Sequence, residues 1–508
     1  MSESGWIPRT RLFLAVALTA AVGAAGSSPP RAASAVSLCV GANQGCFATI
    51  QAALAAAHDG DTIEVGPGTF QGGITILKSL RLVGAGSGAT TIQGGGPVVT
   101  IGEFEGDNDL HVAISRVTIT GGLNDAAGFA DGGGVWIPHG TGQTPGASVT
   151  IADSVVTGNR AAPKATFSDS APCAPVPFDQ CAFASGGGIS SSGTLTLRDT
   201  RVTDNLAGSP GITSYAFGGG IRNSGLGTLT LIRSVVTGNR AAVSAPNGRN
   251  TDGGGIVSNG ALTMEDSVVS GNTSSVGASV PSFFPFDVVE ANAGGIYLAG
   301  GSSTTILHSR ISGNTVVGSN TAGDVEAEAG GIDSDGSLLM VDSSVDHNTA
   351  TGSTPSSLGF LAEADGGGLQ IQGVTTLRNS RVTDNGLSST SATGTAFASG
   401  GGFFNLGASL TLDRVVVTGN SASSTGVGGV NLGGGIGNVQ FFGPPPALAV
   451  TDSVVTANRL AASPGIPSLG GGIFNLEVAL DPFATGNAFP ITLAHTVIAG
   501  NKPDQCAC

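Results

Sequence analysis

The sequence is poor in charged and aromatic residues and contains only six cysteines. Charged residues make up 11% of its 508 residues and aromatic residues 5%, which is far from the average mixture of a globular protein. Apolar residues still account for 40%, and so much apolar surface excludes a disordered chain. After residue 35 no apolar run reaches the roughly 18 residues that a membrane-spanning helix requires, so we expect no membrane span.

Basic residues are scarce as well. The chain has 20 Lys and Arg against 35 Asp and Glu, which gives a formal net charge of −15. So acidic a protein is a poor partner for nucleic acids and for anionic membranes. We therefore expect no nucleic-acid partner, which leaves cations, neutral glycans and protein surfaces.

The first 35 residues have the pattern of an export signal. Arg9 and Arg11 form a short basic region, residues 12–25 are apolar, and residues 33–35 are small enough for signal cleavage. Residues 1–35 are therefore interpreted as a signal peptide, and the mature protein is expected to be secreted, either extracellular or at a cell surface. Loss of three arginines and one glutamate with this segment would change the formal charge from −15 to −17.

Cysteines in an exported protein predict disulfide bonds. The spacing suggests two local pairs and leaves two cysteines in a C-terminal tail over 502–508; these are Cys39 with Cys46, Cys173 with Cys181, and Cys506 and Cys508. Six cysteines allow many pairings, so the connectivity stays open at this stage.

Glycine, by contrast, is abundant, with 84 residues. Glycine clusters begin at 132, 186, 218, 253, 294, 330, 366, 400, 433 and 470, and an asparagine closes each copy at 159, 205, 239, 272, 314, 348, 385, 420, 458 and 501. Between these points short runs such as "TLTL" at 194–197 alternate polar and apolar residues, and turn residues separate the runs. Each copy is predicted to form three short strands joined by tight corners.

Three short strands cannot bury their apolar face alone. Successive copies must therefore stack, with each strand paired in parallel to its counterpart about 4.8 Å away. We expect Leu195 and Leu197 to point inward and to contact Leu229 and Leu231 of the next copy. The predicted fold is all-β, a single-stranded parallel β-helix or solenoid of roughly a dozen turns.

The pattern GGGI, then LTL, then VTGN resembles the repeats of right-handed parallel β-helix proteins in the pectate-lyase-like superfamily, of the type found in exported bacterial surface proteins. The segment "TIQAALAAAHDGDTIEVGPGTF" at 49–70 is similar to the N-terminal segment of that superfamily, in which a short helix, here about 50–57, caps the coil. The resemblance implies a cap segment over 36–75 and a right-handed β-helix over 76–501. It implies no single function, because this fold carries lyases, hydrolases, esterases, adhesins and inert scaffolds.

The closing asparagines and the glycine clusters are interpreted as structural. Ten equivalent copies are what a ladder of stacked amides needs, whereas a catalytic site needs one. Glycine at each cluster would allow the chain to turn a tight corner.

One place in the repeat changes its chemistry from copy to copy. Just before each glycine cluster a small residue, mostly alanine, lies between two residues that share the opposite face of a strand. This face is aromatic in early copies, at Phe129, Phe183, Tyr215 and Phe217. It is acidic in middle copies, at Glu290, Glu326, Glu328, Glu363 and Asp365.

Stacking would bring the five carboxylates within a few ångströms of one another. Carboxylates that close raise each other's pKa or recruit a cation, so they are candidates for a calcium site or an acid/base pair. Calcium is the one cofactor that the sequence suggests. The interpretation preferred from the sequence is simpler: a solvated acidic stripe that discourages aggregation.

The segments between each closing asparagine and the next glycine cluster vary from 11 to 26 residues. Variable loops on one side of a rigid scaffold are a usual place for recognition. Aromatic residues in the longest ones would stack on sugars or cover the coil; they include Phe167, Phe178, Phe283, Phe284 and Phe286.

Two functions are compatible with these features. The first is an exported, non-catalytic β-helix scaffold, expected to be a monomer, whose variable loops serve adhesion or glycan binding with a polysaccharide or a cell-surface protein as partner. The alternative is an extracellular polysaccharide lyase or glycoside hydrolase that uses Glu326, Glu328, Glu363 and Asp365 for acid/base chemistry or to hold calcium.

Overall fold

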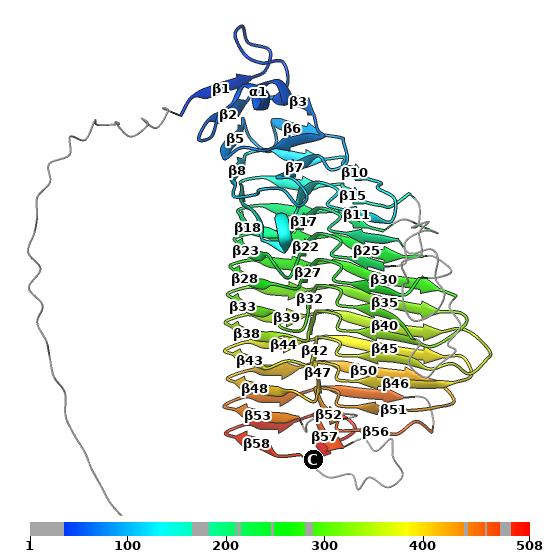
Figure 1. The fold of residues 1–508 in the computed structure, drawn as a ribbon. Helices are drawn as coiled ribbons and strands as arrows, with labels where there is room; N and C mark the ends of the chain where they lie inside the picture. The colour runs from blue at the N-terminus through cyan, green and yellow to red at the C-terminus, as the bar shows by residue number, and fades with distance from the viewer. Residues whose placement is uncertain are drawn as a thin grey trace, which may run out of the picture. The chain divides into compact units, whose positions relative to one another are not determined.

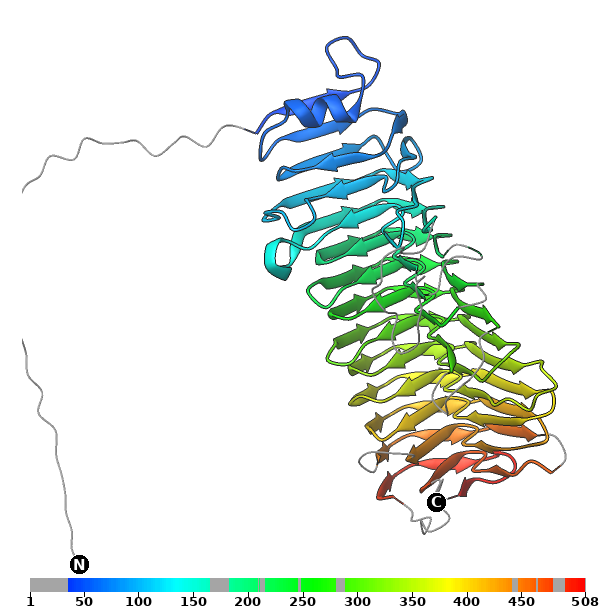
Figure 2. The same ribbon diagram turned by 45° about the vertical axis from the view of Figure 1, so that its right-hand side comes forward.

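The structure, a computed structural model, describes residues 35–164, 182–208, 210, 215–244, 248–279, 288–440, 446–462, 465–477 and 489–507. All pairings between its named strands are parallel, and each strand pairs with its counterparts in the neighbouring turns. Figures 1 and 2 show these turns stacked from the N-terminal strands, in blue, to the C-terminal ones, in red. Because parallel crossover connections are right-handed, the chain forms a right-handed parallel β-helix.

A turn in the middle of the coil has five strands, so the prediction of three strands is wrong. The chain passes through five sheets in a fixed order, which we number 1 to 5, before it returns to sheet 1 in the next turn. The segments expected to be loops supply the two additional strands of each turn. One of these strands pairs with its counterparts in neighbouring turns to form sheet 3, and the other does the same to form sheet 4. Their alternation of small and hydroxyl side chains is sufficient for strands once a preceding turn offers an edge to pair with.

Sheets 1, 2 and 5 enclose the main core. Sheet 1 has 14 strands: β1 (Ser37–Val40), β2 (Thr62–Val65), β5 (Leu80–Gly84), β8 (His111–Ser115), β13 (Gly146–Ala152), β18 (Gly193–Arg198), β23 (Thr228–Ile232), β28 (Ala261–Glu265), β33 (Ser303–Leu307), β38 (Ser337–Val341), β43 (Thr375–Arg378), β48 (Ser409–Asp413), β53 (Ala447–Thr451) and β58 (Ile491–Ala494). Sheet 2 has 13 strands: β3 (Gly68–Gln71), β6 (Thr90–Gln93), β9 (Thr118–Thr120), β14 (Val155–Thr157), β19 (Arg201–Thr203), β24 (Val235–Thr237), β29 (Val268–Ser270), β34 (Arg310–Ser312), β39 (Ser344–Asp346), β44 (Arg381–Thr383), β49 (Val416–Thr418), β54 (Val454–Thr456) and β59 (Val497–Ala499).

Sheet 5 also has 13 strands: β4 (Ile74–Ile76), β7 (Val99–Ile101), β12 (Val135–Ile137), β17 (Ile189–Ser191), β22 (Ile221–Asn223), β27 (Ile256–Ser258), β32 (Ile296–Leu298), β37 (Ile332–Ser334), β42 (Leu369–Ile371), β47 (Phe403–Leu406), β52 (Ile436–Gln440), β57 (Ile473–Glu477) and β60 (Cys506–Ala507). The predicted inward residues are confirmed, since Leu195 and Leu197 pair in register with Leu229 and Leu231 and all four are at most 1% exposed.

Sheets 3 and 4 have 10 strands each and project from the main coil. Sheet 3 contains β10 (Leu123–Asn124), β15 (Arg160–Ala161), β20 (Leu206–Ala207), β25 (Arg240–Val243), β30 (Thr273–Ala278), β35 (Thr315–Asn320), β40 (Thr349–Thr354), β45 (Gly386–Ser391), β50 (Ser421–Thr425) and β55 (Arg459–Ala462). Sheet 4 contains β11 (Phe129–Asp131), β16 (Phe183–Ser185), β21 (Tyr215–Phe217), β26 (Asn250–Asp252), β31 (Val289–Asn292), β36 (Val325–Glu328), β41 (Ala362–Asp365), β46 (Thr395–Ser399), β51 (Gly428–Leu432) and β56 (Ser468–Leu469).

A second core of small side chains fills the space between sheets 3 and 4. It includes Ala216, Ala327 and Ala364 from sheet 4 and Val316 and Ala350 from sheet 3, all at most 1% exposed. Alanine at the middle of each sheet 4 strand lets the two sheets approach closely, and the two residues that flank it must point to the opposite face.

The glycine clusters form corners, as predicted. Gly186 has a φ of 59°, a conformation that side chains rarely adopt. A Cβ atom on Gly187 would lie 2.3 Å from the backbone carbonyl carbon of Leu206, so no side chain fits there.

The closing asparagines form the predicted ladder. Asn348, which is fully buried, donates from Nδ2 to Oδ1 of Asn385 at 2.9 Å and accepts at its own Oδ1 from Nδ2 of Asn314 at 2.9 Å. The same contact joins each neighbouring pair from Asn159 to Asn501. This column of side chains, the asparagine column, is structural.

A short helix caps the N-terminal end of the coil. Helix α1 (Ile50–Ala56) begins at Thr49, whose Oγ1 accepts from the Ala52 N–H at 3.2 Å, and it places Ile50 and Leu54 in the main core. The capping helix predicted at about 50–57 is thus confirmed. None of the described residues belongs to a helix long and apolar enough to cross a membrane.

The Cys39–Cys46 disulfide suggested by spacing is present. Cys506 is also disulfide-bonded. Cys173, Cys181 and Cys508 lie outside the described residues, as do the five loop phenylalanines named above.

Candidate functional site

The five predicted acidic residues lie on three neighbouring strands of sheet 4. Glu290, Glu326 and Glu363, on β31, β36 and β41, are aligned in register as one column, which we call the acid column. Glu328 and Asp365 are aligned in the same way two residues further along their strands. The stacking that the sequence predicts therefore does bring these carboxylates together.

The expected solvated stripe is wrong, because these side chains are not freely exposed. Asp365 is only 1% exposed, and the four glutamates are half-buried. The cause is sheet 5, whose outward-pointing residues face the same region of sheet 4. Asp333 from β37 and Gln370 from β42 cover the carboxylates and are themselves at most 1% exposed.

Three further acids complete the group: Asp252 from the preceding turn of sheet 4, Asp333 from sheet 5, and Asp335 just beyond β37. We define the acidic cluster as Asp252, Glu290, Glu326, Glu328, Asp333, Asp335, Glu363 and Asp365. Asp252 and Asp335 stand elsewhere in the repeat, but Asp333 directly follows the isoleucine of its glycine cluster, a position not included among the sequence-predicted site residues. That position varies from turn to turn, through Arg222, Val257, Tyr297, Asp333 and Gln370, and this variation was the available signal.

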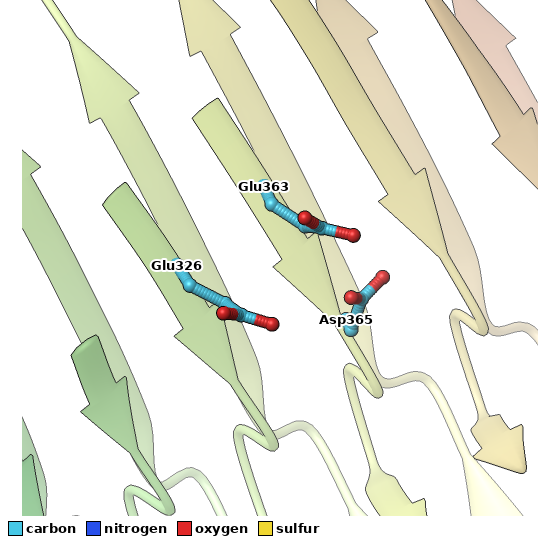
Figure 3. A group of neighbouring side chains, drawn as sticks. All are labelled: Glu326, Glu363 and Asp365. Carbon is cyan, nitrogen blue, oxygen red and sulfur yellow. The ribbon is translucent and has the colours of Figure 1, made fainter. Parts of the chain in front are cut away.

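Three carboxylates of the cluster come especially close. Each of Glu326, Glu363 and Asp365 offers an oxygen, and these oxygens all lie within 4.8 Å of one another. Figure 3 shows Glu326 on one strand and Glu363 and Asp365 on the next, with their carboxylates directed toward the same region.

Burial raises the pKa values throughout the cluster, and repulsion between carboxylates adds to the effect for Asp252, Glu326, Glu328, Asp333 and Asp365. Burial, followed by the Glu290 carboxylate, raises the pKa of Asp252 from 3.8 to about 7. Burial, followed by the Glu363 carboxylate, raises the pKa of Glu326 well above its usual range. Burial is also the main cause that raises the pKa of the other members, namely Glu290, Glu328, Asp333, Asp335, Glu363 and Asp365. Near neutral pH the cluster therefore retains protons or needs a cation.

Tyr297 stands at the edge of the acidic cluster. Its hydroxyl donates to Oδ2 of Asp335 at 3.0 Å. Burial and the nearby carboxylates raise the pKa of Tyr297, so the phenol stays protonated and can donate its hydrogen to Asp335.

Toward the N-terminus sheet 4 carries stacked aromatic rings. The ring centroids of Phe129 and Phe183 are 4.7 Å apart, and those of Phe183 and Tyr215 are 4.9 Å apart. The guanidinium of Arg222 lies 5.2 Å from the Phe217 ring centroid. Because these rings cover one another's faces, little ring face remains for a sugar, apart from Phe129, which is 50% exposed.

Sheet 3 presents a different surface. On β30, β35, β40, β45 and β50 the inward residues alternate with outward ones that carry no charge. We define the hydroxyl face as the outward Thr273, Ser275, Thr315, Ser319, Thr349, Thr351, Ser353, Ser388, Thr390, Ser421, Ser423 and Thr425. Some of these hydroxyls contact one another across strands, as Thr351 and Ser388 do at 3.3 Å.

The fold and these surfaces define a right-handed parallel β-helix protein with an internal acidic cluster. No protein-family model matches the chain, and comparison with curated protein sequences gives no match either. The A-module of the Azotobacter vinelandii mannuronan C-5 epimerase AlgE6 is similar in structure at a TM-score of 0.35 and 14% sequence identity, over 85% of this chain and 94% of that chain. At this level the similarity says nothing about activity, and the fold assignment rests on the strand pairing.

Proposed function

We propose that this protein is an exported, non-catalytic β-helix scaffold that binds a neutral polysaccharide through the hydroxyl face of sheet 3. The observation that carries the proposal is the absence of charged side chains among the outward residues of β30 to β50, in a chain with a net charge of −15. Uncharged hydroxyls donate to and accept from sugar hydroxyls without selecting for a charged ligand.

The regularity of the sheet supports the same ligand class. Outward hydroxyls recur in three columns, at the spacing of about 4.8 Å that parallel pairing imposes. Each column contains one residue without a hydroxyl, namely Gly277, Val317 or Gly386. A single exposed hydroxyl contributes little, but a row of them can engage a repeating polymer at many points at once. The outward face of sheet 1 offers a contrast, because charged residues such as Arg198, Glu265 and Arg378 interrupt it.

Retention on insoluble polysaccharides tests the proposal. The mature protein is expected to sediment with microcrystalline cellulose or chitin and not with alginate or polygalacturonate beads. Thr351→Glu combined with Ser388→Glu, on adjacent strands of the hydroxyl face, should lower retention on the order of tenfold, which is about 1.4 kcal/mol. Thr230→Glu combined with Thr263→Glu, on adjacent strands of sheet 1, is the matched control.

Two outcomes would count against this function. Equal losses in both double variants would mean that added charge, and not the hydroxyl face, matters. Binding to cells that survives removal of surface glycans would instead indicate a cell-surface protein as the partner.

A lyase or glycoside hydrolase is the second candidate, and the raised pKa values of the acidic cluster favour it, because a protonated and an ionised carboxylate together can serve as acid and base. Against it, Asp365 and Asp333 are only 1% exposed, which leaves a polymer little access to them. Incubation with acidic and neutral polysaccharides, followed by absorbance of unsaturated products and by reducing ends, distinguishes the two functions. Any product that disappears in Glu326→Gln would establish the enzyme.

A further inference from the structure

The close group of three carboxylates has the dimensions of a cation site. Calcium binds carboxylate oxygens at about 2.3–2.6 Å, so two oxygens on opposite sides of one ion are separated by at most about 5 Å. The oxygens of Glu326, Glu363 and Asp365 satisfy this limit, since all lie within 4.8 Å of one another. They come from two neighbouring turns, β36 and β41, which a shared ion would link.

Four buried polar atoms without a hydrogen-bond partner belong to Asp365 itself or to residues that face the neighbouring Glu328. Oδ1 of Asp365 and Oδ1 of Asp333 have no partner, and neither do Oε1 and Nε2 of Gln370. Asp333 and Asp365 are 1% exposed and Gln370 is fully buried. The Gln370 amide faces Glu328 and lowers its pKa, but neither amide atom makes a hydrogen bond of ordinary length.

Several buried polar atoms without hydrogen-bond partners in one place need an explanation. Each costs about 1–3 kcal/mol when no partner is present. The asparagine column of the same turns shows that this fold can pair buried polar side chains completely. Oxygen atoms that lack hydrogen-bond donors are what a hard cation requires.

Within the described part of the chain, no basic side chain forms an ion pair with Glu326, Glu363 or Asp365. Among the described residues, the same holds for the other members of the acidic cluster. Arg222 is the basic residue that affects the neighbourhood, and it acts on Asp131 and Asp252, outside the close group of three.

We propose that Glu326, Glu363 and Asp365 bind a calcium ion between the turns of β36 and β41, with Glu328 and Gln370 as neighbouring oxygen donors. Carboxylate and amide oxygens, without histidine or cysteine, select a hard cation over zinc. Calcium suits the site better than magnesium, because calcium accepts irregular arrangements of carboxylate ligands. Magnesium requires near-ideal octahedral coordination with shorter metal–oxygen distances. The ion would relieve the repulsion in the cluster and hold two turns together, independently of any ligand on sheet 3.

Calorimetric titration of the chelator-treated full chain with calcium chloride tests the site. We expect saturable binding to a single site and a melting temperature that rises with calcium concentration, as binding to the folded state requires. Magnesium chloride and zinc chloride at equal concentration should produce smaller shifts. Glu363→Gln and Asp365→Asn should each weaken calcium binding on the order of 100-fold, while the exposed Glu265→Gln on sheet 1 should bind as the wild type does.

The variants are expected to fold, because each removes a repelling charge and keeps the side-chain volume. Circular dichroism and the melting temperature in chelator verify this before titration. Absence of calcium-dependent heat and of any melting shift in the wild type would overturn the proposal, as would unchanged affinity in both Glu363→Gln and Asp365→Asn. Polysaccharide retention is measured on the same samples. Its outcome tests the proposed function on sheet 3 and is independent of the outcome of the calcium titration.

Discussion

Two polar columns run along the stacked turns, and they differ in what each residue offers to the next. In the asparagine column every side chain both donates and accepts, so Asn314, Asn348 and Asn385 satisfy one another. In the acid column Glu290, Glu326 and Glu363 are stacked in the same register but can only accept when ionised. Parallel stacking thus favours a self-complementary group and penalises a carboxylate.

The two columns also differ in extent. The asparagine column runs without interruption from Asn159 to Asn501, whereas the acid column occupies three turns between Asn250 and Phe397. A side chain that every turn repeats is explained by stacking alone. A costly side chain confined to three turns indicates a local role, and we therefore place the cation site there and not at the asparagines.

Conversion of the asparagine column into an acid column tests the comparison most strongly. Asn348→Asp should cost about 3–5 kcal/mol of unfolding free energy at pH 8, because it buries an unpaired charge. The loss should shrink at pH 5, where the new carboxyl takes up a proton. Urea unfolding followed by circular dichroism at both pH values gives the result.

Asn348→Ala provides the matched variant for that experiment. It removes the acceptor of the Asn314 backbone N–H, at 3.0 Å, and should cost about 2–3 kcal/mol at either pH. Asn43→Asp, in an exposed loop, should change little at either pH. Equal pH dependence in Asn348→Asp and Asn348→Ala would contradict the account of the two columns.

A second prediction concerns Asp252, whose raised pKa makes stability depend on pH. The folded state holds this proton more tightly than the unfolded state, since its pKa is about 7 against 3.8. The stability of the metal-free protein should therefore decrease as the pH rises from about 4 to about 7 and level off above that. The polar groups around the carboxyl are Asn250, Glu290, Asn292, Arg222 and Tyr297.

Asp252→Asn should remove this part of the pH dependence. One unit of raised pKa corresponds to about 1.4 kcal/mol, and relaxation of the neighbouring groups reduces the effect, so we expect a difference of about 2 kcal/mol between pH 5 and pH 8. Unfolding in urea with chelator present measures it. The exposed Asp384→Asn should show the same change of unfolding free energy with pH as the wild type. If Asp252→Asn also showed the wild-type change, the assignment of this pH dependence to Asp252 would be refuted.

Several features that depend on one turn contacting the next were predictable from the sequence. The inward Leu195 and Leu197 and the asparagine ladder follow from the repeat, because each needs only the register of neighbouring copies. The capping helix was predicted from the family resemblance of residues 49–70. Even the acid column follows, since strand alternation places Glu326 and Glu363 on one face.

What the sequence did not predict depends on contacts between different sheets of one turn. The core between sheets 3 and 4 is mainly alanine with a few valines and leucines, so these segments lack the valine and isoleucine runs that usually indicate strands. Without these sheets nothing showed that Asp333 and Gln370, from sheet 5, would face Glu328. The burial of the acidic cluster is therefore not predictable from the repeat alone.

A third column, of serine and threonine side chains at the corner between sheets 1 and 2, gives the smallest expected effect on stability. Ser309 is 4% exposed, accepts from the Ser267 N–H at 3.0 Å and donates to the Leu307 carbonyl at 2.7 Å. In one turn Val415 occupies the position of the serine, so this corner tolerates a residue without a hydroxyl. Ser309→Ala should therefore cost about 1 kcal/mol, less than Asn348→Ala, with no dependence on pH or calcium. A loss as large as that of Asn348→Ala would show that stability comes from corner geometry in general and not from the paired amides.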